Sequence, residues 1–153
     1  MQLGNPPQAQ SAGQFVTQIM PRVLEAGQSF ALHALIPPQP HQDMPALYRR
    51  VDLFCLPSWW EAMPLTVLEA MAAGLPVVAT SVGDIARMVE DGVTGRLVPP
   101  HQPEALAGAL EPLLRNVELR RAMGRAARQT VNDRFNLSGA AAALDLLYRE
   151  ALT

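Results

Sequence analysis

Short apolar runs alternate with helical patterns in the middle of the chain. The runs at 51–56 and 76–80 are rich in β-branched or aromatic residues, which is typical of parallel strands buried on both faces. Between them, 64–74 predicts a helix with proline at its first position and glycine at its end. A helix at 84–90 and a strand at 95–98 repeat the alternation. This order predicts an α/β fold with a Rossmann-like parallel sheet.

Helical patterns dominate the rest of the chain. Upstream, 14–26 and 44–50 predict helices on either side of a short strand at 29–36, which consecutive prolines end. From Pro103 onward, leucines recur at helical spacing, so C-terminal helices are expected to follow the sheet.

The composition fits one domain without a polyanionic partner. The chain has 153 residues, of which 49% are hydrophobic and 17% charged, and a formal net charge of −2. No basic face for nucleic acid is therefore indicated. All 12 basic residues are arginines, which excludes any mechanism that needs a lysine. The single cysteine, Cys55, predicts an inert thiol, and the lack of a leader pattern or long apolar run predicts a cytoplasmic protein.

The loop at 57–64 leads from a predicted buried strand directly into the next helix. Ligands of open parallel sheets bind beyond the carboxyl ends of the strands, so this loop is a candidate site. The opening amides of the helix, at Leu65, Thr66 and Val67, have no partner within the helix and can seat a phosphate. In the alternative interpretation, Ser58 or water satisfies these amides.

Two glutamates flank the start of this helix. Glu61 lies in the loop, and Glu69 follows eight positions later among apolar residues of the helix. A lone glutamate in such a helix commonly marks its solvated face. The functional alternative is that Glu69 accepts hydrogen bonds from a ribose diol behind the phosphate seat, while Glu61 contacts the group beyond the phosphates.

The run 56–80 resembles the donor-site segment of retaining glycosyltransferases of family 4, with Glu61 and Glu69 in the positions of their E-x7-E motif. The resemblance continues through the turn at Asp91 and over the C-terminal helices, and covers about 44–153. It implies a GT-B architecture, of which this chain is part of the second, nucleotide-sugar-binding domain.

The resemblance also implies a division of the chain. Residues 1–13 are polar and are expected to be disordered. Residues 14–136 would form the partial Rossmann-like domain, and 137–153 a helix that crosses back onto the first domain. This helix carries an apolar stripe with Leu147 and Tyr148, which is expected to lie uncovered here.

Site roles follow from the resemblance. It implies that Glu61 reaches the donor sugar and is the catalytic candidate, and that Glu69 binds the nucleotide ribose. The backbone near Leu65 and Thr66 would approach the diphosphate or the sugar. The implied donor-binding set is Glu61, Ala62, Met63, Pro64, Leu65, Thr66 and Glu69. No metal and no cofactor is expected, since no Asp-x-Asp pair follows a strand.

The chain departs from the family pattern in several places. Ala62 and Asp84 stand where the family commonly has glycine. The arginine and lysine that grip the diphosphate have no counterpart, and the first domain, which binds the acceptor, is absent. The stretch 29–43 has no room for the helix and strand expected there. We therefore expect a truncated or shortened chain that is catalytically incomplete alone.

Other side chains have two interpretations. Trp59 and Trp60 either pack or stack on a sugar face. The three histidines, His33, His41 and His101, share no metal-ligand spacing and are expected to be structural or on the surface. An arginine cluster on the C-terminal helices predicts a solvated face, with the inner membrane surface as the alternative contact. Its members are Arg115, Arg120, Arg121, Arg125 and Arg128.

The sequence leads to two main hypotheses. The first is the donor-binding part of a metal-independent, retaining glycosyltransferase of polysaccharide biosynthesis. It would transfer a sugar from a nucleoside diphosphate sugar to an acceptor hydroxyl, with the first domain or a partner subunit supplying the acceptor site. The second is a non-catalytic remnant that binds a nucleotide sugar, or a partner protein through its last helix. A dinucleotide oxidoreductase is disfavoured because the glycine fingerprint is missing.

Overall fold

The predicted alternation of helices and strands is present in the computed structural model. The structure describes residues 44–136 and, beyond them, 139, 141, 145 and 147–149. The expected helix at 14–26 and strand at 29–36 lie outside the described residues. The elements are α3 (Met44–Tyr48), β1 (Phe54–Leu56), α4 (Leu65–Ala72), β2 (Val77–Thr80), α5 (Ile85–Met88), β3 (Gly95–Val98), α6 (Pro103–Arg115) and α7 (Val117–Arg134).

The three described strands form a parallel sheet in the order β1-β2-β3. Ala79 at the centre pairs with Leu56 on one side and Leu97 on the other. Every residue of β2 is buried, as expected for a central parallel strand. The expectation of full burial was wrong for β1, whose three residues are half-buried. The physical reason is position, because among the described strands β1 pairs only with β2.

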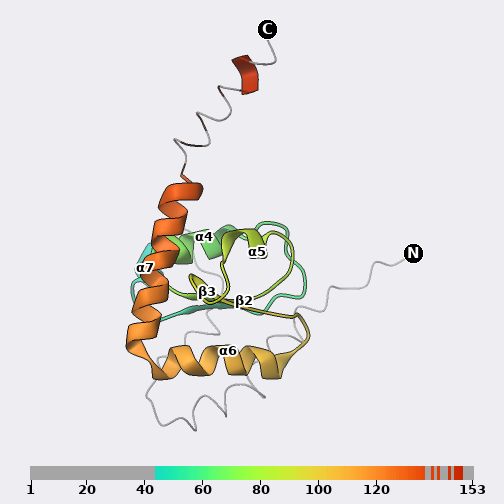
Figure 1. Ribbon diagram of the computed structural model, residues 1–153, viewed down its shortest axis with the longest axis vertical. Helices are drawn as coiled ribbons and strands as arrows, with labels where there is room; N and C mark the ends of the chain where they lie inside the picture. The colour runs from blue at the N-terminus through green and yellow to red at the C-terminus, as the bar shows by residue number, and fades with distance from the viewer. Residues whose placement is uncertain (1–43, 137–138, 140, 142–144, 146, 150–153) are drawn as a thin grey trace, which may run out of the picture.

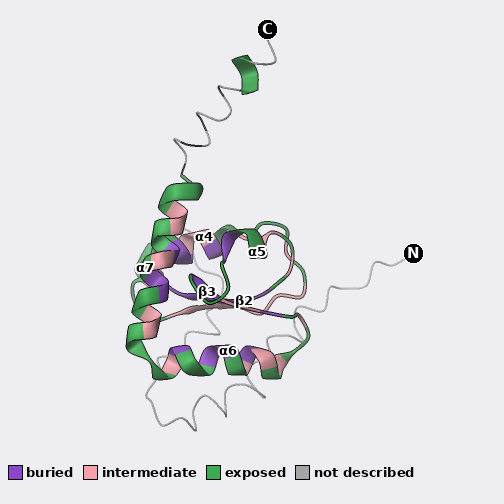
Figure 2. Ribbon diagram, viewed as in Figure 1, coloured by how far each residue is buried: buried purple, intermediate pink, exposed green. Residues whose placement is uncertain are grey.

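Helices cover both faces of the sheet (Figure 1). α4 and α5 lie over one face and α6 over the other, while α7 runs along the side and packs on both α4 and α6. The alternation along β2 matches this, since Val77 and Ala79 belong to the core under α4 and Val78 belongs to the core over α6. On the helices, the buried positions lie on the sides that face the sheet (Figure 2). The predicted α/β class is confirmed.

The contact between α4 and α7 depends on a glycine. A Cβ atom built on Gly124 would lie 2.0 Å from the carbonyl oxygen of Gly74, just beyond the end of α4. Only a residue without a side chain lets the two backbones approach so closely. Gly108 in α6 differs, because a Cβ atom there meets nothing within 4 Å.

We predict that Gly124→Ala destabilises the chain, whereas Gly108→Ala stabilises it. Overpacking against backbone costs about 1–3 kcal/mol, and alanine in an open helical position gains about 0.5–1 kcal/mol over glycine. Urea unfolding followed by circular dichroism measures both changes. Equal unfolding midpoints for the two variants would contradict the close approach of α7 to α4.

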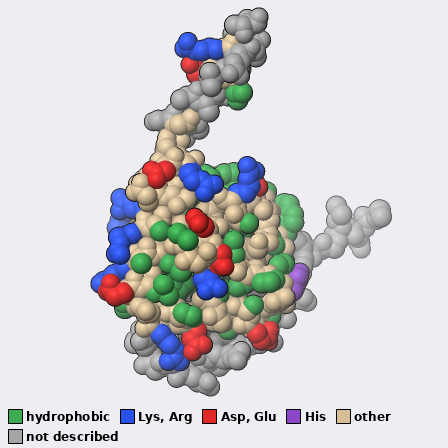
Figure 3. Space-filling model, in the orientation of Figure 1, with side chains coloured by type: hydrophobic (Ala, Val, Ile, Leu, Met, Phe, Trp, Pro, Cys, Tyr) green, Lys and Arg blue, Asp and Glu red, His purple; other side chains and the backbone are tan. Residues whose placement is uncertain are grey.

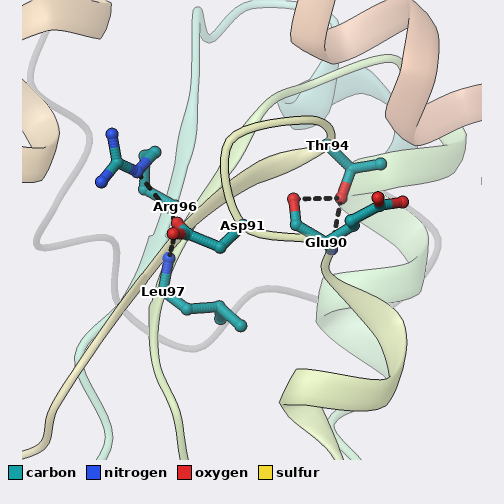
Figure 4. A network of polar contacts seen from close by, with 5 residues as sticks. All are labelled: Glu90, Asp91, Thr94, Arg96 and Leu97. Atoms are coloured by element: carbon teal, nitrogen blue, oxygen red, sulfur yellow. Dashed lines mark hydrogen bonds and ion pairs between the residues drawn. The ribbon is translucent and has the colours of Figure 1, made fainter.

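The predicted turn between α5 and β3 is held by its own side chains (Figure 4). The Asp91 carboxylate accepts hydrogen bonds from the Leu97 amide and from Arg96 Nε, both at 2.9 Å. The buried Thr94 Oγ1 accepts one from the Glu90 amide at 2.8 Å. The hydrogen bond from the Leu97 amide, with the neighbouring Arg96 charge, lowers the pKa of the Asp91 carboxyl.

The lowered pKa of Asp91 makes the turn sensitive to acid. Because the folded-state pKa lies below the unfolded one, the stabilisation is present above the unfolded value of about 3.9 and is lost as the pH falls below it. We expect Asp91→Ala to have a lower melting temperature than the wild type at pH 6. This difference in melting temperature is expected to shrink by pH 3. Thermal scans across this range test it, and a gap that grows on acidification would overturn the assignment.

The end of the chain exposes part of the predicted apolar stripe. Leu147 and Tyr148 are 61% and 63% exposed, as expected, whereas most of the predicted helix at 137–153 lies outside the described residues. Within the described stretches, no helix has both the length and the apolar character needed to cross a membrane.

Candidate functional site

The loops after β1 and β2 are joined at the carboxyl edge of the sheet. The hydroxyl of Thr80, the last residue of β2, donates to the Ser58 carbonyl in the loop after β1. The Asp84 amide donates to the Ala62 carbonyl at 2.9 Å. The loop predicted from sequence is therefore anchored from the central strand and from the start of α5.

Gly83 permits this junction. Its φ is +54°, and a Cβ atom there would lie 2.1 Å from the carbonyl oxygen of Glu61. The departure at Asp84 is accommodated, since its backbone closes the junction and its carboxylate meets Arg87 at 3.4 Å on the surface. The other departure, Ala62, is exposed and contributes its carbonyl to the same junction.

The Glu61 side chain is held within its own loop. The Ser58 hydroxyl donates to Glu61 Oε1 at 2.7 Å. Ser58 therefore does not cap the following helix, which was one of the two alternatives to a ligand seat, the other being water. A half-buried carboxylate fixed in this way keeps one oxygen engaged and retains acceptor capacity on the other.

The start of α4 has no side-chain cap. Pro64 is the N-cap residue rather than the first helical residue, and no side chain bonds to the helix start. The expectation of three unpartnered amides was wrong at Val67, whose amide donates to the Pro64 carbonyl at 3.1 Å. Leu65 and Thr66 are both exposed, so their amides form the remaining candidate anion seat. Met63 is also exposed and Pro64 half-buried at the entrance to the helix.

Glu69 does not lie on a solvated face. It is half-buried, and the Tyr48 hydroxyl donates to its Oε2 at 3.0 Å. Glu69 follows Leu65 by four positions and Thr66 by three, so its side chain lies one turn along α4 from the side chains of these two residues. Sequence reasoning missed Tyr48, because no spacing rule connects residues 21 positions apart on different elements.

The two tryptophans have different environments. The Trp59 ring lies against His101, with centroids 4.5 Å apart and planes at 53°, so it packs between the loop after β1 and the one after β3. Trp60 is 78% exposed. Burial raises the pKa of the Cys55 thiol to about 12, which keeps it protonated and unreactive at neutral pH, as expected.

Three arginines of α6 and α7 make contacts close to them in the chain. Figure 3 shows cationic side chains along the edge of the molecule that α7 forms. Arg115 and Arg121 pair with glutamates one turn earlier, both at 3.1 Å, and Arg120 donates to the carbonyls at the end of α6. These contacts fit a solvated face, while the membrane contact stays a prediction. Throughout 44–136 and the described positions after it, no group of three or more His, Cys, Asp or Glu could hold a metal ion.

We predict that Gly83→Ala disturbs the loop junction more than Gly92→Ala disturbs the turn. Both glycines have positive φ, so alanine costs each about 1–2 kcal/mol of backbone strain. Only at Gly83 does the new methyl group also collide with backbone. We expect Gly83→Ala to lower the melting temperature more than Gly92→Ala does. Only Gly83→Ala is expected to shift the tryptophan emission. Identical behaviour of the two variants would contradict the junction.

The amino-acid sequence of the chain matches known glycosyltransferases. The model of the family described as "Glycosyl transferases group 1" matches residues 31–130. A D-inositol 3-phosphate glycosyltransferase of Paenarthrobacter aurescens is 41% identical over 117 residues, which are 76% of this chain and 28% of that protein. The same enzyme of Salinispora arenicola is 45% identical over 94 residues, which are 61% of this chain and 21% of that protein. The chain thus spans about a quarter of the length of these relatives.

Solved structures agree on the fold. Sucrose-phosphate synthase of Thermosynechococcus elongatus superposes with a TM-score of 0.71 at 28% identity, covering 97% of this chain and 37% of that one. The C-terminal domain of a glycosyl transferase group 1 protein of Francisella tularensis gives a TM-score of 0.63 at 24% identity, covering 87% of this chain and 66% of that one. The predicted GT-B type of domain is therefore confirmed.

Proposed function

The chain belongs to the glycosyl transferases group 1 family, and from this premise we propose that it binds the sugar donor of a retaining, family 4-like glycosyltransferase. In this proposal a sugar passes from a nucleoside diphosphate sugar to an acceptor hydroxyl with retention of configuration. The observation that carries it is the uncapped start of α4, followed one turn later by a carboxylate held in place. The non-catalytic alternative is not favoured, since the family and the curated relatives are glycosyltransferases.

The start of α4 is proposed to bind the diphosphate. Cleavage of the donor leaves negative charge on the diphosphate and positive character on the sugar. Amides aimed at a developing charge stabilise it without reorganisation, and the helix end adds about half a positive charge. The exposed Leu65 and Thr66 amides would take this role, with Ala62, Met63 and Pro64 forming the approach. The diphosphate is then held through backbone amides rather than through a metal ion.

Glu69 is proposed to bind the ribose of the nucleotide. It lies one turn along α4 from the amides of the proposed anion seat, and we propose that a ribose attached to the diphosphate reaches it there. A carboxylate is acceptor-only and can take hydrogen bonds from both hydroxyls of a diol. The resemblance to the E-x7-E motif supports the same role.

Glu61 is proposed to orient the donor sugar and to stabilise its cationic character. Its place in the loop before α4 puts it on the far side of the anion seat from Glu69 in the chain. The Ser58 hydroxyl fixes one carboxylate oxygen. The acceptor would bind to a first domain or a partner subunit at the cytoplasmic side of the membrane, as in polysaccharide biosynthesis.

We predict that Glu69→Ala weakens binding of uridine or guanosine diphosphate about tenfold or more. A lost hydrogen bond to a charged group corresponds to about 1.5–3 kcal/mol. Isothermal titration calorimetry with each nucleotide measures the change in Kd.

The matched control is Glu104→Ala, which removes an exposed carboxylate from the first turn of α6, on the other face of the sheet. This variant is expected to bind as the wild type does. Unchanged affinity in Glu69→Ala, or an equal loss in both variants, would refute the assigned role of Glu69.

A further inference from the structure

Tyr48 holds the Glu69 carboxylate from the core. Its side chain is 5% exposed, at the end of α3, and its hydroxyl donates to Glu69 Oε2 at 3.0 Å. A phenylalanine would fill the same apolar space without a polar group to satisfy. The hydroxyl therefore contributes a specific contact with Glu69, in addition to the packing of the ring.

The Tyr48 ring is itself fixed. It meets Phe54 of β1 edge to face, with centroids 6.1 Å apart and planes at 70°, and it belongs to the core under α4. The position of the hydroxyl is thus set by packing between α3, α4 and β1. Burial and the Glu69 carboxylate raise the pKa of Tyr48, so the phenol stays protonated and remains a donor throughout the neutral range.

A fixed donor restricts a flexible acceptor. A glutamate side chain has several rotatable bonds, and ordering it upon ligand binding would cost affinity. The contact with Tyr48 already orders the Glu69 side chain in the folded protein, so less entropy is lost when a ligand binds. A carboxylate has about four lone-pair positions on its two oxygens, so the hydrogen bond from Tyr48 does not by itself prevent the carboxylate from accepting others.

We propose that Tyr48 is a positioning residue, whose hydroxyl orients the Glu69 carboxylate to receive the two ribose hydroxyls of the nucleotide. This inference rests on the proposed function, because it assumes that Glu69 binds ribose. If the role of Tyr48 were purely structural, the same contact would only stabilise the packing of α3 on α4. Its loss would then have no effect specific to ribose binding.

The test is Tyr48→Phe, which removes one oxygen and keeps the packed ring. Calorimetry is performed with the diphosphate that the wild type binds, uridine or guanosine diphosphate, and with its 2′,3′-dideoxy form. We expect the Kd for the ribonucleotide to rise about three- to tenfold, the size of one hydrogen bond. The Kd for the dideoxy form is expected to stay at the wild-type value, because it offers Glu69 no diol.

Two further variants complete the experiment. Tyr148→Phe removes the same hydroxyl from the chain's other tyrosine, which is 63% exposed, and should leave both Kd values unchanged. In the Glu69→Ala background, Tyr48→Phe should cause no further loss, since residues that act through one another are not additive. Melting temperatures of all variants confirm that the compared proteins are folded.

The outcomes separate the two proposals. If Glu69→Ala weakens the ribonucleotide but Tyr48→Phe binds as wild type does, or loses both nucleotides equally, the positioning role is overturned and the proposed function stands. If Glu69→Ala itself leaves ribonucleotide binding unchanged, the role of Glu69 in the proposed function fails first. A loss of affinity in Tyr48→Phe that is confined to the ribonucleotide, and that disappears in the Glu69→Ala background, supports both the positioning role and the proposed function.

Discussion

The carboxyl end of the buried strand β2 is the constraint on which the candidate site depends. All four residues of β2 are buried between helices on both faces, so the strand has no room to shift. Its last residue, Thr80, carries a hydroxyl that needs an acceptor once buried, and finds it in the Ser58 carbonyl of the neighbouring loop. Gly83 then allows the next turn to lie against the same loop. The core thus fixes the loop through the Thr80 side-chain hydrogen bond and the close backbone approach at Gly83.

The two glutamates are fixed in different ways. Glu61 is bound by Ser58, three residues earlier in the same loop, so its position follows the loop. Glu69 is bound by Tyr48, which the core holds from another helix. Both schemes meet at α4, which carries the Leu65 and Thr66 amides at its start and Glu69 one turn later, and which buries Val67, Ala70 and Met71 in the core. Sites held by packed elements keep their geometry better than sites on loops alone.

The sequence predicted those parts of the structure that local chemistry decides. The strand Gly95–Val98 has the predicted bounds, since a glycine turn precedes it and prolines follow it. The burial of β1 was overestimated, because an apolar run does not say how many neighbours a strand will have. The Val67 amide was misjudged because it forms a tighter bond to the carbonyl three residues earlier, and Tyr48 was missed because its contact is tertiary. Periodicity gives elements and faces, whereas partners across the fold need coordinates.

In the proposed function, the charges of the site divide donor binding between the start of α4 and the two glutamates. The start of α4 supplies about half a positive charge, whereas a nucleoside diphosphate carries several negative charges. Glu61 and Glu69 add negative charge near it, and three arginines of α6 and α7, Arg115, Arg120 and Arg121, are engaged in contacts of their own. The described residues are therefore suited to orient a ribose and a sugar, and to direct a diphosphate, more than to neutralise it.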